Sequence, residues 1–158
     1  MSNLRVQSSL LSGVALLLLG VAPALAEGPF RFYSITPCRL VDTRIPAEGP
    51  PLSANTTRDF QVQGKCGVPV GAKAAFLNVT AVSPPSQGHL RLFPSGAPMP
   101  LVVSTLNFQG GEPAVANGAI IPLSDNADDL SVYTYFLQGS GTTDLVLDVT
   151  GYFAPPTP

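Results

Sequence analysis

Paired carboxylates are the first candidates for chemistry in this 158-residue sequence. Asp144 and Asp148 are four residues apart, and two carboxyl groups can serve a glycosidase as acid and as nucleophile or base. On one strand, however, they would lie roughly 13 Å apart, beyond the ~5 to 9.5 Å that such enzymes use. The pair alone is therefore not expected to form a site, and a pairing of either residue with Asp42 or Glu112 stays open.

Nucleophilic catalysis has little support in the sequence. His89 is the single histidine, and no Gly-x-Ser-x-Gly motif surrounds any serine. A triad of His89 with Ser95 or Ser104 would have to be assembled by the fold alone. We predict a protein that is not an enzyme and needs no cofactor. We interpret His89 as an exposed or hydrogen-bonded structural residue near the start of a strand.

Two charged clusters could hold a ligand or an ion. Asp42 and Arg44 are two residues apart and would share one face of a strand; they are too close for ideal pairing with each other and could instead pair across strands. We interpret them as a structural polar bracket. The segment Asp125 to Asp129 is rich in the oxygen ligands that calcium requires, but it lacks EF-hand spacing. We interpret it as a turn, with calcium binding as the alternative.

Tyr133 and Tyr135 fall on one face of a predicted strand, about 6.8 Å apart. Such a pair can serve as an aromatic platform for sugar rings. The sequence contains no tryptophan, and Leu137 continues the same face. Core packing between sheets is therefore the simpler interpretation, and a carbohydrate platform is the alternative.

The first residues indicate export. A basic Arg5, an apolar run from Leu10 to Val21 and a small-residue site at Ala24-Leu25-Ala26 predict a cleaved signal peptide over residues 1–26. The two cysteines, Cys38 and Cys66, would then meet an oxidising compartment, which favours a disulfide over two free thiols. A zinc site is less favoured because one histidine cannot complete four ligands.

Short runs of Val, Leu, Thr, Phe and Tyr alternate with dense Pro and Gly turns, which predicts strands and no long helix. About nine short strands are expected, at residues 30–35, 39–43, 57–63, 74–82, 89–93, 102–108, 119–123, 130–137 and 144–153. They predict an all-β, antiparallel β-sandwich with Greek-key or jelly-roll-like connections. One domain over residues 27–153 and a Pro-rich tail over 154–158 complete the organisation.

Six segments together resemble a mostly uncharacterised module of secreted and surface proteins in soil-type bacteria. They are Thr36–Arg44 (TPCRLVDTR), Gly64–Pro69 (GKCGVP), Leu77–Thr80 (LNVT), Ser104–Phe108 (STLNF), Ala116–Asn117 and Leu147–Phe153 (LDVTGYF). The resemblance spans nearly the whole mature chain. It implies a secreted β module in which Cys38 pairs with Cys66, and it transfers no catalytic residues.

The charge content limits the partners. Charged residues make up 11% of the chain and the net charge is −2, with no basic cluster to displace the counterions of a nucleic acid. We expect a secreted, non-enzymatic module at an extracellular protein or polysaccharide surface, with no nucleic acid and no membrane insertion after cleavage. A carbohydrate-binding module is the alternative, and an extracellular hydrolase is less favoured.

Overall fold

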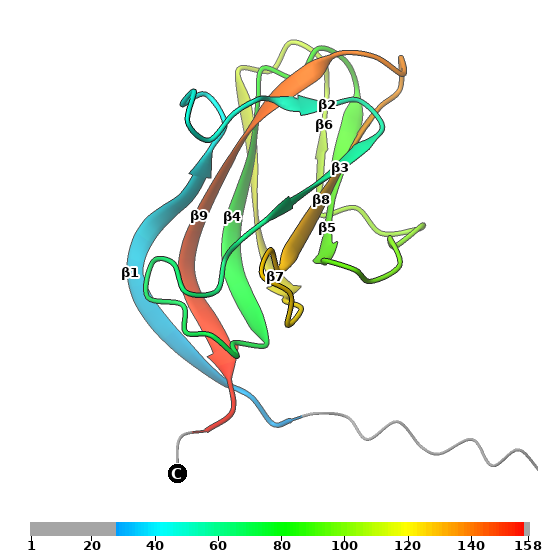
Figure 1. Ribbon diagram of the computed structural model, residues 1–158. Helices are drawn as coiled ribbons and strands as arrows, with labels where there is room; N and C mark the ends of the chain where they lie inside the picture. The colour runs from blue at the N-terminus through cyan, green and yellow to red at the C-terminus, as the bar shows by residue number, and fades with distance from the viewer. Residues whose placement is uncertain (1–27, 157–158) are drawn as a thin grey trace, which may run out of the picture.

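The computed structural model describes residues 28–156, which form two facing antiparallel sheets (Figure 1). The predicted all-β sandwich is confirmed. The strands are β1 (Arg31–Asp42), β2 (Leu52–Ser53), β3 (Thr56–Phe60), β4 (Ala74–Val82), β5 (Gly88–Pro94), β6 (Leu106–Phe108), β7 (Ala114–Pro122), β8 (Leu130–Phe136) and β9 (Thr142–Ala154). The predicted signal peptide lies outside the described residues. Within these, no helix has the length and apolarity needed to cross a membrane.

The strand order places distant parts of the chain side by side. The larger sheet runs β1-β9-β4-β7, with the short β2 also pairing with β9, and the smaller sheet runs β3-β8-β5-β6. From β3 onward the chain crosses repeatedly between the sheets, which is the connection pattern of a jelly roll. The chain therefore enters and leaves at the same end, where Arg31 pairs with Ala154 (Figure 1).

Several predicted strand boundaries are wrong, and one of them lies at a proline. Residues 30–35 and 39–43 were expected to be separate strands, but β1 is continuous from Arg31 to Asp42. Its pairing with β9 shifts register between Ser34 and Cys38, around Pro37. A bulge at this position accommodates a residue that cannot donate a ladder hydrogen bond. The strand predicted at residues 119–123 is also longer than expected, because β7 begins at Ala114, five residues earlier.

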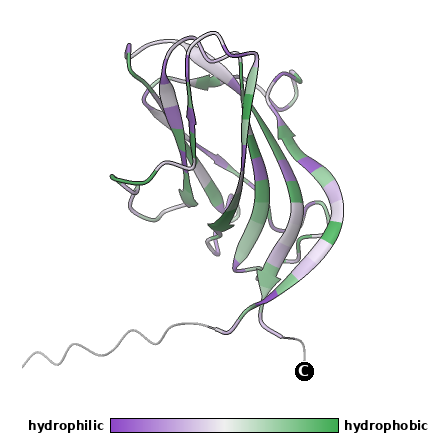
Figure 2. Ribbon diagram, turned by 180° about the vertical axis from the view of Figure 1, so that it is seen from behind, coloured by the Kyte–Doolittle hydropathy of each residue, from purple (hydrophilic) through white to green (hydrophobic). Residues whose placement is uncertain are grey.

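The core lies between the two sheets, and alternation along the strands fills it. On the inward face of the larger sheet, alternate residues of β4 pair with alternate residues of β9, and all are fully buried: Leu77 with Val149, Val79 with Leu147 and Ala81 with Leu145. Figure 2 shows hydrophobic and hydrophilic positions following one another along the strands. β9 is a central strand, paired on both sides by β1 and β4.

A bulge near the end of β9 reverses this alternation. Phe76 pairs with Gly151 and Leu77 with Val149, so Thr150 is an extra residue in the ladder. Phe153 would share the inward face of Val149 if the alternation continued, but it packs instead against the exposed Phe32, with ring centroids 5.2 Å apart. Tyr152 takes the place against the core. β9 also runs one residue into the predicted Pro-rich tail.

Candidate functional site

Tyr133 and Tyr135 lie on the outer face of the smaller sheet. The residues that alternate with them, Val132, Thr134 and Phe136, are fully buried in the core, whereas the two tyrosines are half-buried. The interpretation of this pair as core packing is therefore wrong. The apolar side chains of Val132 and Phe136 bury more favourably than a phenol, so the strand turns its tyrosines outward.

Each tyrosine has a cationic or aromatic neighbour on β5. His89 pairs with Tyr135 in the ladder, and their rings stack with centroids 4.9 Å apart and planes at 22°. Arg91 pairs with Tyr133, and its guanidinium lies 5.6 Å from the centre of that ring. The same guanidinium donates a 3.0 Å hydrogen bond to the carbonyl of Pro100. Contacts across the sheet thus fix the orientation of all four side chains.

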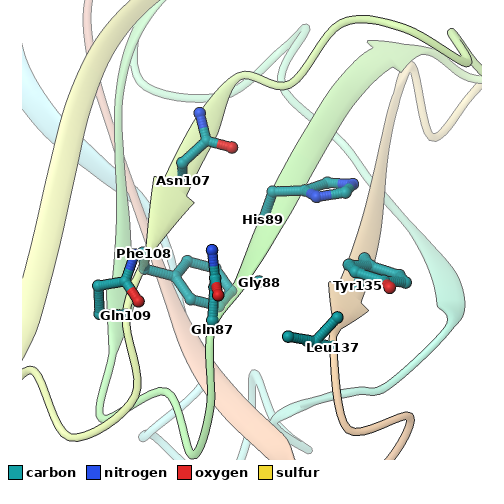
Figure 3. Close-up of a pocket in the computed structure, with 8 residues that line it drawn as sticks. All are labelled: Gln87, Gly88, His89, Asn107, Phe108, Gln109, Tyr135 and Leu137. Atoms are coloured by element: carbon teal, nitrogen blue, oxygen red, sulfur yellow. The ribbon is translucent and has the colours of Figure 1, made fainter.

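A cavity of about 280 Å³ opens beside the His89 and Tyr135 stack (Figure 3). It draws side chains from three neighbouring strands and the residues that flank them: Gln87 and His89, Asn107 and Gln109, Tyr135 and Leu137. In Figure 3 the amides of Asn107 and Gln109 form one side, and Tyr135 and Leu137 form the other. One wall is therefore polar and the other is aromatic and aliphatic.

The polar wall is ordered by its own hydrogen bonds. Ser104 donates from its hydroxyl to the Oδ1 of Asn107 over 2.9 Å. This contact directs the amide and leaves the Nδ2 hydrogens to serve a ligand. Gln109 is held through its backbone, where its N–H donates to the Glu112 carboxylate over 2.7 Å.

The cavity carries almost no charge. Its lining residues include no carboxylate and no basic side chain other than His89. Burial lowers the pKa of His89 below its usual 6.5, and the positive charge of Arg91 lowers it further. Both effects favour the neutral imidazole. Its Nε2 is buried, and no group in the described residues hydrogen-bonds to it; the expectation of an exposed or hydrogen-bonded histidine is wrong for this atom.

Asp42 and Arg44 pair directly with each other, in contrast to the expectation that they would pair across strands. Arg44 donates to both carboxylate oxygens, from Nε over 2.7 Å and from Nη2 over 2.6 Å. The chain turns after Asp42, where the Ile45 N–H bonds the Asp42 carbonyl, and this turn brings Arg44 back. Arg39 also reaches Asp42 over 3.2 Å. The hydrogen bonds from Arg44 lower the pKa of the buried Asp42 to about 2.

Three other carboxylates named in the sequence analysis have hydrogen-bond partners of their own. Asp148 accepts a 2.9 Å hydrogen bond from Arg39, and Asp144 accepts one of 2.8 Å from the Thr43 hydroxyl. In the segment Asp125 to Asp129, for which a turn was predicted and calcium binding was the alternative, Asp129 is fully buried. It accepts hydrogen bonds from the backbone of Val62 and Gln63 over 3.0 and 2.7 Å. Burial raises the pKa of Asp129.

The remaining side chains of that segment point elsewhere. Asn126 donates to the Ser95 carbonyl over 3.1 Å, and Asp125 lies 3.8 Å from Lys73. Over residues 28–156, no three His, Cys, Asp or Glu side chains gather as metal ligands.

Cys38 and Cys66 form the predicted disulfide, with their Cα atoms 5.7 Å apart. Cys38 lies in β1 and Cys66 in the loop that follows β3. The bond therefore ties the edge of the larger sheet to a segment arriving from the smaller one.

Sequence reasoning missed the polar wall of the cavity. Gln87, Asn107 and Gln109 are single amides without a chemical motif, and only the pairing of β5 with β6 and β8 brings them near Tyr135. Asn107 belongs to the segment Ser104–Phe108, which carries part of the resemblance, but no motif in the sequence indicates that it binds a ligand. No protein-family model matches the chain, and no curated protein matches its sequence.

Proposed function

We propose that the protein is a secreted, non-enzymatic β-sandwich module that binds an extracellular surface or matrix component through the outer face of the smaller sheet. The observation that carries this proposal is a cluster of two cross-strand pairs on that face, His89 with Tyr135 and Arg91 with Tyr133. Aromatic side chains with polar ends are the residues that interfaces favour, because they bury area and still form hydrogen bonds.

Secretion is supported by two features. The predicted signal peptide indicates export, and the Cys38–Cys66 disulfide is compatible with an oxidising compartment. The resemblance to secreted bacterial modules agrees with both.

A recognition role fits the cavity better than a hydrolytic one. Hydrolysis by paired carboxylates needs two of them on either side of a bound substrate. Asp144 and Asp148 are instead engaged with Thr43 and Arg39, on the larger sheet and the turn that follows β1. A cavity with one polar wall and one aromatic and aliphatic wall, and with no carboxylate in its lining, supplies contacts for binding. We assign it no bond-breaking step.

The test is retention on insoluble material. Protein secreted by an exporting host is mixed with bacterial cell walls, cellulose and chitin, and the fraction left in solution is measured. Tyr133→Ala and Tyr135→Ala should each reduce retention at least several-fold. Phe32→Ala is the matched control, because it removes a 48% exposed aromatic ring from the other sheet.

Equal retention of all three variants and the parent would overturn the proposal. Release of soluble sugar or peptide from the solid material over time would also overturn it, because the protein would then be an enzyme.

A further inference from the structure

The contrast between the two walls of the cavity identifies the class of its ligand. We infer that the cavity between Asn107, Gln109 and Tyr135 binds a single uncharged sugar ring of an extracellular saccharide. This inference rests on the proposed function and names the ligand for it.

The apolar wall matches one face of a sugar ring. A pyranose presents C–H groups on its faces and hydroxyl groups around its rim. The stacked rings of His89 and Tyr135 and the side chain of Leu137 offer a surface for the C–H face. Leu137 is 64% exposed in the free protein, so a ligand that covers it removes apolar area from water.

The polar wall matches the rim of the ring. Each sugar hydroxyl both donates and accepts hydrogen bonds. The amides of Gln87, Asn107 and Gln109 each carry donors and an acceptor, so they can serve such hydroxyls in either direction. All three residues are exposed around the cavity, which allows their side chains to reach a bound ligand.

The charge of the site selects a neutral ligand. The lining has no Asp, Glu, Lys or Arg side chain with which to pair a uronic acid or an amino sugar, and burial favours the neutral form of His89. Desolvating a charged ligand there would cost free energy without a compensating ion pair. Arg91, a cation on the same face, lies outside the lining and is engaged with Tyr133 and Pro100.

The size of the cavity sets how much of the saccharide it can hold. Its volume of about 280 Å³ lies just below the ~300 to 1,000 Å³ of most ligand pockets. We therefore expect it to hold one ring. Further sugars of the chain would lie along the open face of the sheet.

The experiment is a titration followed by amide NMR on the isotope-labelled secreted protein. The probes are the methyl glycosides of glucose, galactose, mannose and N-acetylglucosamine, with glucuronic acid and glucosamine as charged counterparts. At least one neutral glycoside should shift the side-chain amides of Gln87, Asn107 and Gln109, with a Kd on the order of 1 mM, as expected for a ligand of few atoms.

Variants on the two walls test the geometry. Asn107→Ala and Gln109→Ala alter exposed side chains and should weaken binding about tenfold without unfolding the protein. Tyr135→Phe should retain binding, because it keeps the ring. Phe32→Ala is the matched control; it removes an exposed ring from the other sheet and should leave the affinity for the free glycoside unchanged.

The outcomes separate this inference from the proposed function. Tighter binding of the charged sugars, or amide shifts that Asn107→Ala and Gln109→Ala leave unchanged, would overturn the inference. If no neutral glycoside shifts these amides while Tyr133→Ala still lowers retention on solid material, the inference is wrong and the proposed function stands. If the retention is also unaffected, both are wrong.

Discussion

At the scale of single residues, the Asp42 carboxylate has the most partners of the groups described above. It accepts hydrogen bonds from the side chains of Arg44 and Arg39 and from the Arg44 backbone N–H. It is also 5% exposed. A buried carboxylate is tolerated only when such donors replace the water it loses. The Asp42 and Arg44 pair thus closes the turn after β1, which fits the interpretation of a structural bracket.

The lowered pKa of Asp42 gives a prediction for acid stability. Because the folded-state pKa is about 2 and the usual value is 3.8, the charged carboxylate stabilises the fold above pH 3.8. This contribution is lost as the pH falls through the folded-state value. Asp42→Asn should lower the thermal midpoint at pH 6, and the difference from the parent should shrink steadily toward pH 2. Thermal melts followed by circular dichroism at each pH provide the measurement.

Asp125→Asn is the control for this prediction, because it alters an exposed carboxylate with one long contact to Lys73. It should change the midpoint little at any pH. A difference between Asp42→Asn and the parent that is equally large at pH 2 and pH 6 would contradict the assigned role of the charge.

At the scale of the strand, the bulge in β9 explains why two glycines on the larger sheet differ in importance. A Cβ on Gly151 would lie 2.3 Å from two ring carbons of Phe32 and 2.9 Å from the Tyr33 carbonyl oxygen. A Cβ on Gly118 would make an ordinary 3.4 Å contact with the ring of Phe76. Both glycines lie in strands, where glycine is otherwise unfavourable.

We therefore expect opposite outcomes from the same substitution. Gly151→Ala should destabilise the protein by roughly 1 to 3 kcal/mol, because the strand is overpacked against β1. Gly118→Ala should be neutral or slightly stabilising, because alanine loses less conformational entropy on folding. Urea unfolding of both variants measures the two values.

The double variant Phe32→Ala with Gly151→Ala identifies the clash. Adding Gly151→Ala to Phe32→Ala should cost less free energy of unfolding than adding it to the parent, because the ring of Phe32 is gone. Part of the cost should persist, because the contact with the Tyr33 backbone remains. If Gly118→Ala is as damaging as Gly151→Ala, the position of the bulge at Thr150 is wrong.

At the scale of the whole molecule, the disulfide joins β1 of the larger sheet to the loop that leaves β3 of the smaller sheet. Cys38 and Cys66 are 28 positions apart in sequence, and the loop they close contains the turn after β1 and the first strand of the smaller sheet. Closing a loop of this length restricts the unfolded chain and should stabilise the fold by ~3 to 4 kcal/mol on the chain-entropy model.

The double variant Cys38→Ser with Cys66→Ser should lose about that free energy of unfolding, because its unfolded chain is no longer cross-linked. Replacing both cysteines also avoids leaving an unpaired thiol. Urea unfolding measures the loss, and mass spectrometry of the unreduced parent should find no free thiol. Unchanged stability of the double variant would show that the native packing of β1 and β3 already fixes this loop.

The sequence determined the class of the fold and the disulfide, because both depend on local signals. Turn residues at short intervals, between runs of Val, Leu, Thr, Phe and Tyr, predicted strands without long helices. The predicted export signal and the single cysteine pair predicted the disulfide. The same local rules failed at Pro37 and Thr150, where bulges keep one strand continuous and reverse the faces of another. A bulge depends on the partner strand, which a single segment does not specify.

The tertiary structure alone decided the candidate site. Alternation placed Tyr133 and Tyr135 on one face, but whether that face meets the core or water depends on which neighbours pack more favourably against the opposite sheet. Gln87, Asn107 and Gln109 belong to segments whose pairing with β8 or β5 is long-range, so no spacing in the sequence brings them beside Tyr135. Local periodicity gives the faces of a strand, whereas strand order, which arises from burial of the whole core, gives the neighbours that make a site.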